Sequence, residues 1–421
     1  MSPRYLLRAV VTTALGLVAA HPAGALVINL IDQGGVTGSP AEQGFKIAAA
    51  YWESVLTNNV TLNFGVGYSA LPTGVIGSTT SAGMDYSLSN FETGWNATRS
   101  HSKLDQTAVL PTLTNGAMKM ITSGPSSGTN GDNTASNKRV YDQDTTGTKA
   151  TNNNTLYLNT SVVEAIGGTA VYDSSNAHHL DADITFSSTF GFDFDPSNGT
   201  SAKTFDFIGT AIHEMGHALG FVSGVDEYDY YGSPRGPGRS QVTNFNMNTN
   251  SWFSSLDLFR YSMDPTNLVP GTTPVLDEAV GSPAYFSIDG GAHQLFGSSL
   301  FSTGAYNGDG HQASHWKDIP GTAGCTLQLG IMDPTECYGQ ADYVTALDLA
   351  AFDALGWNLN VNILYDPSYH MTTASIYNAY KSGALRSAAP VPEPASWALM
   401  LTGFGLIGSM LRRRRVAVAF A

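Results

Sequence analysis

The sequence is poor in charged residues, and in basic residues above all. Of its 421 residues, 13% are charged, only 20 are lysine or arginine, and the formal net charge is −14. The small number of basic side chains excludes binding to nucleic acid through a basic surface. The low share of charged residues excludes a highly charged disordered chain. With 42% hydrophobic residues, the chain is expected to form one or two globular domains. Its aspartate and asparagine oxygens make Ca²⁺ a candidate ion.

An apolar run marks the beginning of the chain. It follows Arg4 and Arg8, extends from Ala9 to Ala20, and precedes Ala23-Gly24-Ala25, which fits an A-x-A cleavage site. The run is shorter than the ~20 apolar residues that a membrane span needs. Residues 1–25 are therefore expected to be a signal peptide, which signal peptidase removes before Leu26.

A second apolar run lies near the end of the chain. Val391-Pro392-Glu393-Pro394 precedes an apolar segment, 395–411, and a cluster of four arginines, 412–415. An apolar span followed by basic residues is a stop-transfer layout. The order and spacing resemble the PEP-CTERM sorting signal, which implies a transmembrane segment within 391–415 and processing of the tail by an exosortase. The alternative is a permanent single-span anchor. Either arrangement places the preceding chain outside the cytoplasm, at the cell surface or secreted into the extracellular matrix.

The segment His213-Glu214-Met215-Gly216-His217 has the H-E-x-x-H pattern of a catalytic zinc site. Residues four apart lie on one face of a helix, so His213 and His217 can offer two nitrogens to one Zn²⁺. Glu214 stands beside them, where it can act as general base towards a zinc-bound water. The alternative is a chance match on an amphipathic helix. The context opposes it, because apolar residues at helical spacing surround the histidines and Gly220 is placed to end the helix.

The rest of the chain predicts an α+β fold around this helix. Strands are expected at 26–31, 60–66 and 181–188, and helices at 41–56 and 345–357, the last with a capping box of Thr345 and Asp348. Residues 72–154 are expected to form long loops, and residues 226–310 a long insertion. The catalytic domain is therefore assigned to 26–360 and a linker to 361–390.

The two cysteines, Cys325 and Cys337, fall within one short region. In an exported protein this spacing favours a local disulfide, the alternative being two reduced thiols. No cysteine precedes the H-E-x-x-H helix, which excludes a propeptide cysteine that holds the zinc latent.

The motif alone does not supply a third metal ligand. The compact metzincin motif has a histidine three residues after the glycine, where this chain has Ser223. Farther along stand His311-Gln312-Ala313-Ser314-His315-Trp316 and then Ile331-Met332-Asp333-Pro334. A late histidine followed by a methionine turn resembles the leishmanolysin type of metzincin, in which an insertion separates the glycine from the third histidine. The resemblance implies a zincin-like domain with a mixed β-sheet, a central metal-binding helix, a Met-turn and long loop insertions.

The resemblance also assigns roles to residues. It makes His315 the third zinc ligand and Met332 the residue that packs beneath the metal, and it makes the strand at 181–188 the border of the substrate cleft. Two alternatives for the third ligand stay open, His311 and Asp226. Pro334 stands where some metzincins have an oxyanion-stabilising tyrosine, which leaves Tyr338 as the nearest candidate.

The expected function is an exported zinc metalloendopeptidase that acts on protein or peptide substrates, with Zn²⁺ held by His213, His217 and His315, and Glu214 as the base. A surface or matrix-binding protein that keeps the zincin fold without turnover is a second hypothesis. A zinc hydrolase of a non-peptide substrate is a third. Glu214 favours an enzyme, because a base is needed for hydrolysis and not for metal binding.

Overall fold

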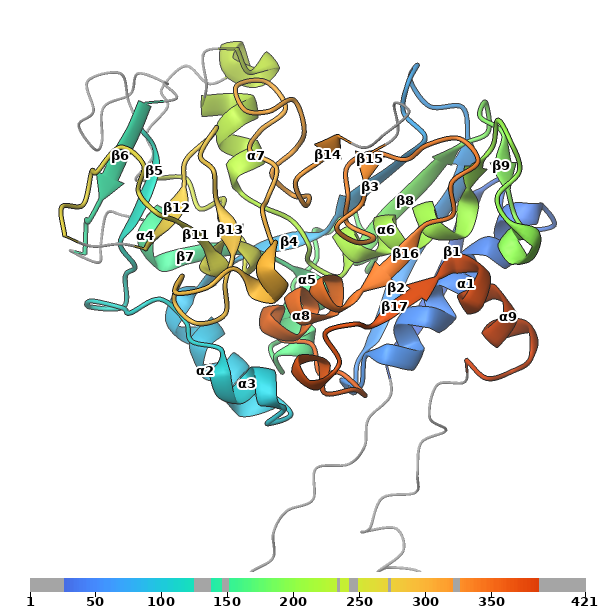
Figure 1. The fold of residues 1–421 in the computed structure, drawn as a ribbon, viewed down its shortest axis with the longest axis horizontal. Helices are drawn as coiled ribbons and strands as arrows, with labels where there is room; N and C mark the ends of the chain where they lie inside the picture. The colour runs from blue at the N-terminus through green and yellow to red at the C-terminus, as the bar shows by residue number, and fades with distance from the viewer. Residues whose placement is uncertain are drawn as a thin grey trace, which may run out of the picture. The chain divides into compact units, whose positions relative to one another are not determined.

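The computed structural model describes residues 26–124, 138–145, 151–232, 235–241, 249–271, 274–320 and 326–385. These residues belong to one folded unit, 25–389. The unit combines helices with several small sheets, which confirms the expected α+β class (Figure 1). The expected signal peptide at 1–25 and the expected tail at 391–415 lie outside the described residues. Cys325 does too, so its disulfide with Cys337 stays a prediction.

A four-stranded mixed sheet contains the three strands expected from the sequence. Strands β1, β2 and β8 run parallel, whereas β3 runs antiparallel to β8 and ends the sheet. The order of the strands is β1 (Val27–Gly34), β2 (Thr61–Ser69), β8 (Ala182–Ser187) and β3 (Gly77–Ser81). Strand β8 therefore has a neighbour on both sides, and β3 and β1 are the two edge strands.

Two helices, α1 (Pro40–Val55) and α6 (Phe207–Ala218), pack against each other beside this sheet. The rings of Phe45 and Phe207 meet edge to face, 5.2 Å apart, and the Trp52 indole N–H donates to the Ile212 carbonyl oxygen at 3.1 Å. Phe45 also meets Phe186 of β8 at 5.1 Å. Apolar burial on both helices thus anchors α6, which carries the H-E-x-x-H motif, to α1 and to the sheet.

The described part of 72–154 is not the run of long loops expected from its composition. It contains β3, β4 (Gly83–Ser87), α2 (Leu88–Thr98), α3 (Lys103–Thr107), β5 (Met120–Gly124), β6 (Lys138–Asp142) and α4 (Thr151–Asn154). The expectation was wrong because these strands are formed by pairing. Strand β4 pairs with β7 (Thr155–Asn159), and β5 pairs with β12 (Val275–Glu278), far along the chain.

The insertion at 226–310 folds onto that earlier segment. Its strands join β5 and β6 in a five-stranded sheet with the order β13-β11-β12-β5-β6. Strand β11 spans Arg260–Ser262 and β13 spans Tyr285–Phe286. Leu256, Leu258 and Phe259 form a short 3₁₀ turn whose side chains lie in the main hydrophobic core. The insertion is therefore an integral part of the folded unit.

Helix α8 (Ala346–Leu355) begins with the expected capping box, in which Thr345 and Asp348 bond each other's backbone N–H groups. The interval 361–390, expected to be a linker, contains folded elements instead. Strand β17 (His370–Thr372) pairs with β16 (Tyr343–Thr345), and α9 (Thr373–Lys381) buries Ile376. A three-residue strand and a mostly polar helix leave too weak a pattern to be recognised in the sequence.

The other short α-helices and strands of the described residues are α5 (Thr160–Ala165), α7 (Val225–Glu227), β9 (Phe192–Asp193), β10 (Phe205–Asp206), β14 (Ile319–Pro320) and β15 (Thr326–Leu327). Within the described ranges, no helix has both the length and the apolar character that crossing a bilayer requires. The span expected at 395–411 lies outside those ranges.

Candidate metal centre

Helix α6 has defined ends that fix where its side chains point. At its start, the Asp206 carboxylate accepts hydrogen bonds from the N–H groups of Ile208 and Gly209, both at 3.1 Å. At its end, Gly220 adopts a φ of +106°, a conformation that a residue with a Cβ rarely takes. The chain turns sharply there, which brings the Phe221 carbonyl oxygen back against His217.

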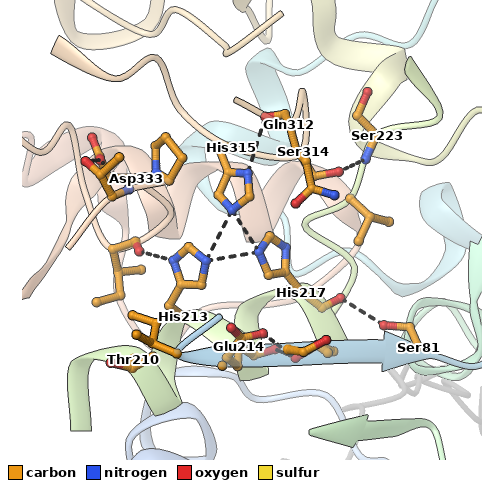
Figure 2. Close-up of a pocket in the computed structure, with 18 of the residues that line it drawn as sticks. Ser81, Thr210, His213, Glu214, His217, Ser223, Gln312, Ser314, His315 and Asp333 are labelled. Carbon is orange, nitrogen blue, oxygen red and sulfur yellow. Dashed lines mark hydrogen bonds between the residues drawn. The ribbon is translucent and has the colours of Figure 1, made fainter. Parts of the chain in front are cut away.

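Three histidines from two distant segments converge on one point. His213 and His217 come from α6, and His315 comes from the loop after the insertion (Figure 2). Their Nε2 atoms are 3.0 Å apart for His213 and His217, 3.2 Å for His217 and His315, and 3.3 Å for His213 and His315. The structure therefore brings together the three histidines that the sequence and the metzincin resemblance named.

The hydrogen bond at Nδ1, the other ring nitrogen, determines which nitrogen of each histidine carries the proton. Nδ1 of His213 is 2.7 Å from the Ile331 carbonyl oxygen, and Nδ1 of His217 is 2.7 Å from that of Phe221. Nδ1 of His315 lies 3.3 Å from the Gln312 carbonyl oxygen. A carbonyl oxygen only accepts, so each Nδ1 must donate, and each neutral ring then presents a bare lone pair at Nε2.

Three lone pairs that face one another repel unless a cation lies between them. Four-coordinate Zn²⁺ has Zn–N distances of about 2.0–2.1 Å, which places neighbouring nitrogens roughly 3.3 Å apart. The observed separations match that spacing. Burial lowers the pKa of His213 to about 4 and that of His217 to about 3, so both rings are neutral at neutral pH. The donor set thus fits a divalent metal that prefers imidazole nitrogen.

Glu214 is buried beside the cluster and is held by the edge strand. The Thr79 hydroxyl of β3 donates to its Oε2 atom at 2.6 Å. Burial raises the pKa of Glu214 to about 7, and the bond from Thr79 opposes that rise. Sequence reasoning missed Thr79, because the segment Gly77–Ser81 shows no strand pattern and lies far from the motif in the sequence.

The two alternative third ligands lie outside the cluster. Nε2 of His311 is 3.3 Å from the Asp318 carboxylate, which pairs it away from the other histidines. The Asp226 carboxylate accepts hydrogen bonds from the N–H groups of Ala313 and Ser314, at 2.6 and 3.0 Å, and from the Ser314 hydroxyl. Asp226 therefore holds the loop that presents His315.

Met332 packs against α6 at Gly216, which lies between His213 and His217 in the sequence. A Cβ atom added at Gly216 would lie 2.5 Å from its sulfur, so a glycine there permits the close approach. The Asp348 carboxylate accepts from the N–H groups of Ile331 and Met332, at 2.9 and 3.3 Å, and from the Trp316 indole at 2.8 Å. The buried Asp348 carboxylate thus joins α8 to the turn that carries Met332 and to Trp316, which follows His315 in the sequence.

The histidines open into a cavity of about 550 Å³. Strand β3 lines it, and not β8, so the expectation that the strand at 181–188 borders the cleft was wrong. Tyr338 is not among the described residues that line the cavity. It is 56% exposed and stacks on Phe205 at 4.2 Å, so its expected role at an oxyanion is not supported.

Within the described residues, the three histidines are the only group of three or more metal-binding side chains close enough to share one ion. The binding of Ca²⁺ stays a prediction, since Ca²⁺ also takes backbone and amide oxygens as ligands.

Comparison with known proteins informs the tail of the chain only. Residues 390–415 match a family model described as the PEP-CTERM protein-sorting motif. No curated protein and no solved structure matches the chain. The expected sorting signal is confirmed, and the motif implies export and processing by an exosortase. The chain thus carries a PEP-CTERM sorting motif at its C-terminal end.

Proposed function

We propose that this protein is an exported zinc-dependent endopeptidase of the metzincin type. The observation that carries the proposal is the convergence of three histidine Nε2 atoms within 3.3 Å, with each Nδ1 facing a carbonyl oxygen. A pair of histidines four residues apart on a helix can arise by chance. A third histidine from a loop 98 residues beyond His217, oriented in the same way, is far harder to explain without a shared metal.

His213, His217 and His315 would hold the metal and leave its remaining position facing the cavity. When bound there, Zn²⁺ would supply Lewis acidity, which polarises a carbonyl and eases the deprotonation of water. The carbonyl oxygens of Ile331, Phe221 and Gln312 orient the three rings. Such partners fix the tautomer and raise the basicity of the ligating nitrogen.

Glu214 is the proton carrier in this proposal. Its carboxylate takes the proton from the attacking water and delivers it to the leaving amine. Thr79 donates to Oε2, which leaves Oε1 as the oxygen available for the proton. The hydroxyl thereby holds the carboxylate in the lining of the cavity.

The substrate is proposed to lie along β3. This strand ends the four-stranded sheet and lines the cavity, so its outer edge offers backbone N–H and C=O groups beside the histidines. An extended peptide can pair with such an edge by strand addition. That placement would carry the peptide backbone past Glu214.

The test compares casein hydrolysis and zinc content of the full chain with those of Glu214→Gln. Loss of a general base costs about 10²- to 10⁴-fold in rate, while the metal ligands stay intact. We expect Glu214→Gln to keep its zinc and lose at least a hundredfold in turnover. Glu92→Gln, the same change at an exposed position of α2, serves as the control. Equal turnover by Glu214→Gln would contradict the mechanism. A zinc-loaded parent that cleaves no protein would favour a binding protein or a hydrolase of another bond.

A further inference from the structure

A second cavity lies next to the one that contains the histidines. Its volume is about 600 Å³, and Glu227 and Gln312 line both cavities. The Gln312 carbonyl oxygen is 3.3 Å from Nδ1 of His315 (Figure 2), so part of the second cavity is formed by the loop that carries the third histidine. A group bound in the second cavity would therefore lie beside the proposed metal centre.

One buried carboxylate ties together two walls of this second cavity. Asp229 belongs to a single π-helical turn, Tyr228–Gly232, and is 1% exposed. It accepts hydrogen bonds from the N–H groups of Tyr306 and Asn307, at 2.7 and 3.0 Å, and from the Asn307 side-chain amide at 2.7 Å. The cavity is thus formed before a ligand enters it, which lowers the entropic cost of binding.

Three tyrosines give the second cavity an aromatic lining. The rings of Tyr230 and Tyr231 are 4.7 Å apart and nearly perpendicular, and the ring of Tyr306 is 6.0 Å from that of Tyr230. A tyrosine offers a rigid ring whose faces are apolar and whose hydroxyl is polar. The ring face is also electron-rich, so it attracts C–H groups of a ligand.

The polar groups that stay available in this cavity include donors as well as acceptors. Among the hydrogen bonds of the described residues, none involves the three tyrosine hydroxyls, the Gln312 amide or the Glu227 carboxylate. The other two acids in the lining are already engaged, because Asp226 and Asp229 each accept three hydrogen bonds. No lysine or arginine is among the described residues that line the cavity.

These groups fit an uncharged ligand that is rich in hydroxyls. An anion would meet three carboxylates and no basic side chain. An ammonium or guanidinium group has donors only, so it would leave the amide and hydroxyl donors of the cavity without an acceptor. A sugar hydroxyl both donates and accepts, and a sugar ring presents C–H groups to an aromatic face.

We propose that a sugar residue of the substrate binds in the second cavity, on a subsite formed by Glu227, Tyr230, Tyr231, Tyr306 and Gln312. The inference rests on the proposed peptidase function for the rest of the substrate. It adds the substrate class, a glycosylated peptide or protein whose sugar lies close to the bond that is cleaved. Because two of these residues line both cavities, a sugar attached to a peptide in the first cavity can enter the second.

The test measures the binding of glycopeptides separately from their hydrolysis. Peptides with one serine, moved position by position, are compared with the same peptides carrying O-linked glucose, galactose, N-acetylglucosamine or N-acetylgalactosamine on that serine. Dissociation constants are measured on the full chain carrying Glu214→Gln, and kcat/KM is measured on the parent. At one position, we expect a glycopeptide to bind at least about tenfold more tightly than the bare peptide, the size of effect that aromatic contacts produce.

Tyr306→Ala and Tyr231→Ala, each added to Glu214→Gln, should bring the ratio of glycopeptide to bare-peptide binding close to one, because each removes an aromatic wall. Tyr365→Ala changes a tyrosine that is 73% exposed and outside both cavities, and it should leave the ratio unchanged. The bare peptide controls for folding within each variant, since it reports on every contact except those of the sugar.

The outcomes separate the subsite from the peptidase proposal. Tighter binding of a glycopeptide, without hydrolysis of any peptide by the parent, would sink the peptidase proposal and support the subsite. Hydrolysis with equal affinity for bare and glycosylated peptides at every position would overturn the subsite alone. A sugar preference that survives both Tyr306→Ala and Tyr231→Ala would also overturn it. Choline that binds the parent but not Tyr306→Ala, in the absence of any sugar preference, would assign the cavity to an organic cation instead.

Discussion

At the scale of single residues, the site depends on side chains that act through their neighbours. Thr79 is 135 residues from Glu214 in the sequence, yet its hydroxyl donates to the Glu214 carboxylate at 2.6 Å and to the Glu214 carbonyl oxygen at 3.0 Å. Asp226 holds the loop that carries His315, because its carboxylate accepts three hydrogen bonds from that loop. Both are positioning residues, because neither lies in the histidine cluster.

Thr79→Val should slow turnover without loss of metal. The change removes the donor to Glu214 and keeps the shape of the side chain, and a hydrogen bond to a charged group is worth about 1.5–3 kcal/mol. We expect kcat to fall about tenfold to a hundredfold at unchanged zinc content, measured by stopped assays on a protein substrate. Thr80→Val makes the same change on an exposed residue of β3 and should leave kcat unchanged. A parent-like rate for Thr79→Val would remove Thr79 from the mechanism.

Asp226→Asn should weaken zinc binding but not abolish it. An amide cannot accept all three bonds from Ala313 and Ser314, so the loop carrying His315 loses its anchor. Loss of a partner that orients a ligand typically costs 10- to 100-fold in metal affinity. Competition with a zinc chelator measures this change. Asp264→Asn, where the buried carboxylate accepts from the Val269 N–H at 2.8 Å, is the matched control for a loop anchor away from the histidines. Complete loss of zinc in Asp226→Asn would instead make Asp226 a ligand.

The sequence identified His213, Glu214 and His217 because their function depends on spacing along one helix. His315 could be named only through the metzincin resemblance, since the loop that carries it has no periodicity. Thr79 and the anchoring role of Asp226 could not be found in this way. Both act across tertiary contacts, which one sequence does not reveal.

At the scale of elements, a carboxyl group whose charged form is unfavourable is buried where α3 meets α8. Asp105 of α3 and Asp353 of α8 are 2% and 1% exposed, and Oδ1 of Asp353 has no hydrogen-bond partner. Ser102 donates to the other oxygen at 3.2 Å. Burial, with repulsion from Asp105, holds the pKa of Asp353 well above its usual range.

Asp353→Asn should stabilise the protein, and more so as the pH rises. The folded state keeps a proton on Asp353 that the unfolded chain releases above about pH 4. The unfolded state therefore binds fewer protons, and the stability contributed by this group falls as the pH rises towards the folded pKa. Asparagine cannot ionise, so we expect a Tm at pH 8 higher than that of the parent by roughly 2 °C or more, with a smaller gap at pH 5. Differential scanning calorimetry at both pH values measures the effect.

The control for this change is Asp366→Asn, which alters an exposed aspartate in the same way. A Tm difference that is the same at pH 5 and pH 8 would show that ionisation of Asp353 does not contribute. A lower Tm for Asp353→Asn at pH 8 would contradict the argument outright.

Elements with a strong local signal were predictable, and elements formed by pairing were not. Helix α1 buries Phe45, Ala48 and Trp52 at helical spacing, and the bounds expected for it, 41–56, differ from Pro40–Val55 by one residue at each end. Strand β3 has the sequence Gly-Ser-Thr-Thr-Ser, which shows no apolar alternation. It becomes a strand only because it pairs with β8, and it is the strand that lines the cavity.

At the scale of the whole molecule, the centre joins parts of the chain that the insertion separates. Helix α6, the loop that ends at His315 and the turn that carries Met332 meet within one unit, 25–389. The PEP-CTERM motif at 390–415 follows that unit directly and implies export. Composition argued against binding to nucleic acid through a basic surface, and the pattern of expected strands and helices predicted the α+β class. It could not predict that the insertion would share a sheet with the segment before the motif, because long-range pairing depends on the whole fold.

The most direct test of the account is the zinc content of the full chain and of its histidine variants, measured by mass spectrometry of the metal after removal of loosely bound ions. The account predicts about one zinc per chain for the parent and for His311→Ala, and none for His315→Ala. His311→Ala is the matched control, because it removes a histidine four residues away that pairs with Asp318. Zinc retained by His315→Ala and lost by His311→Ala would contradict the centre described here.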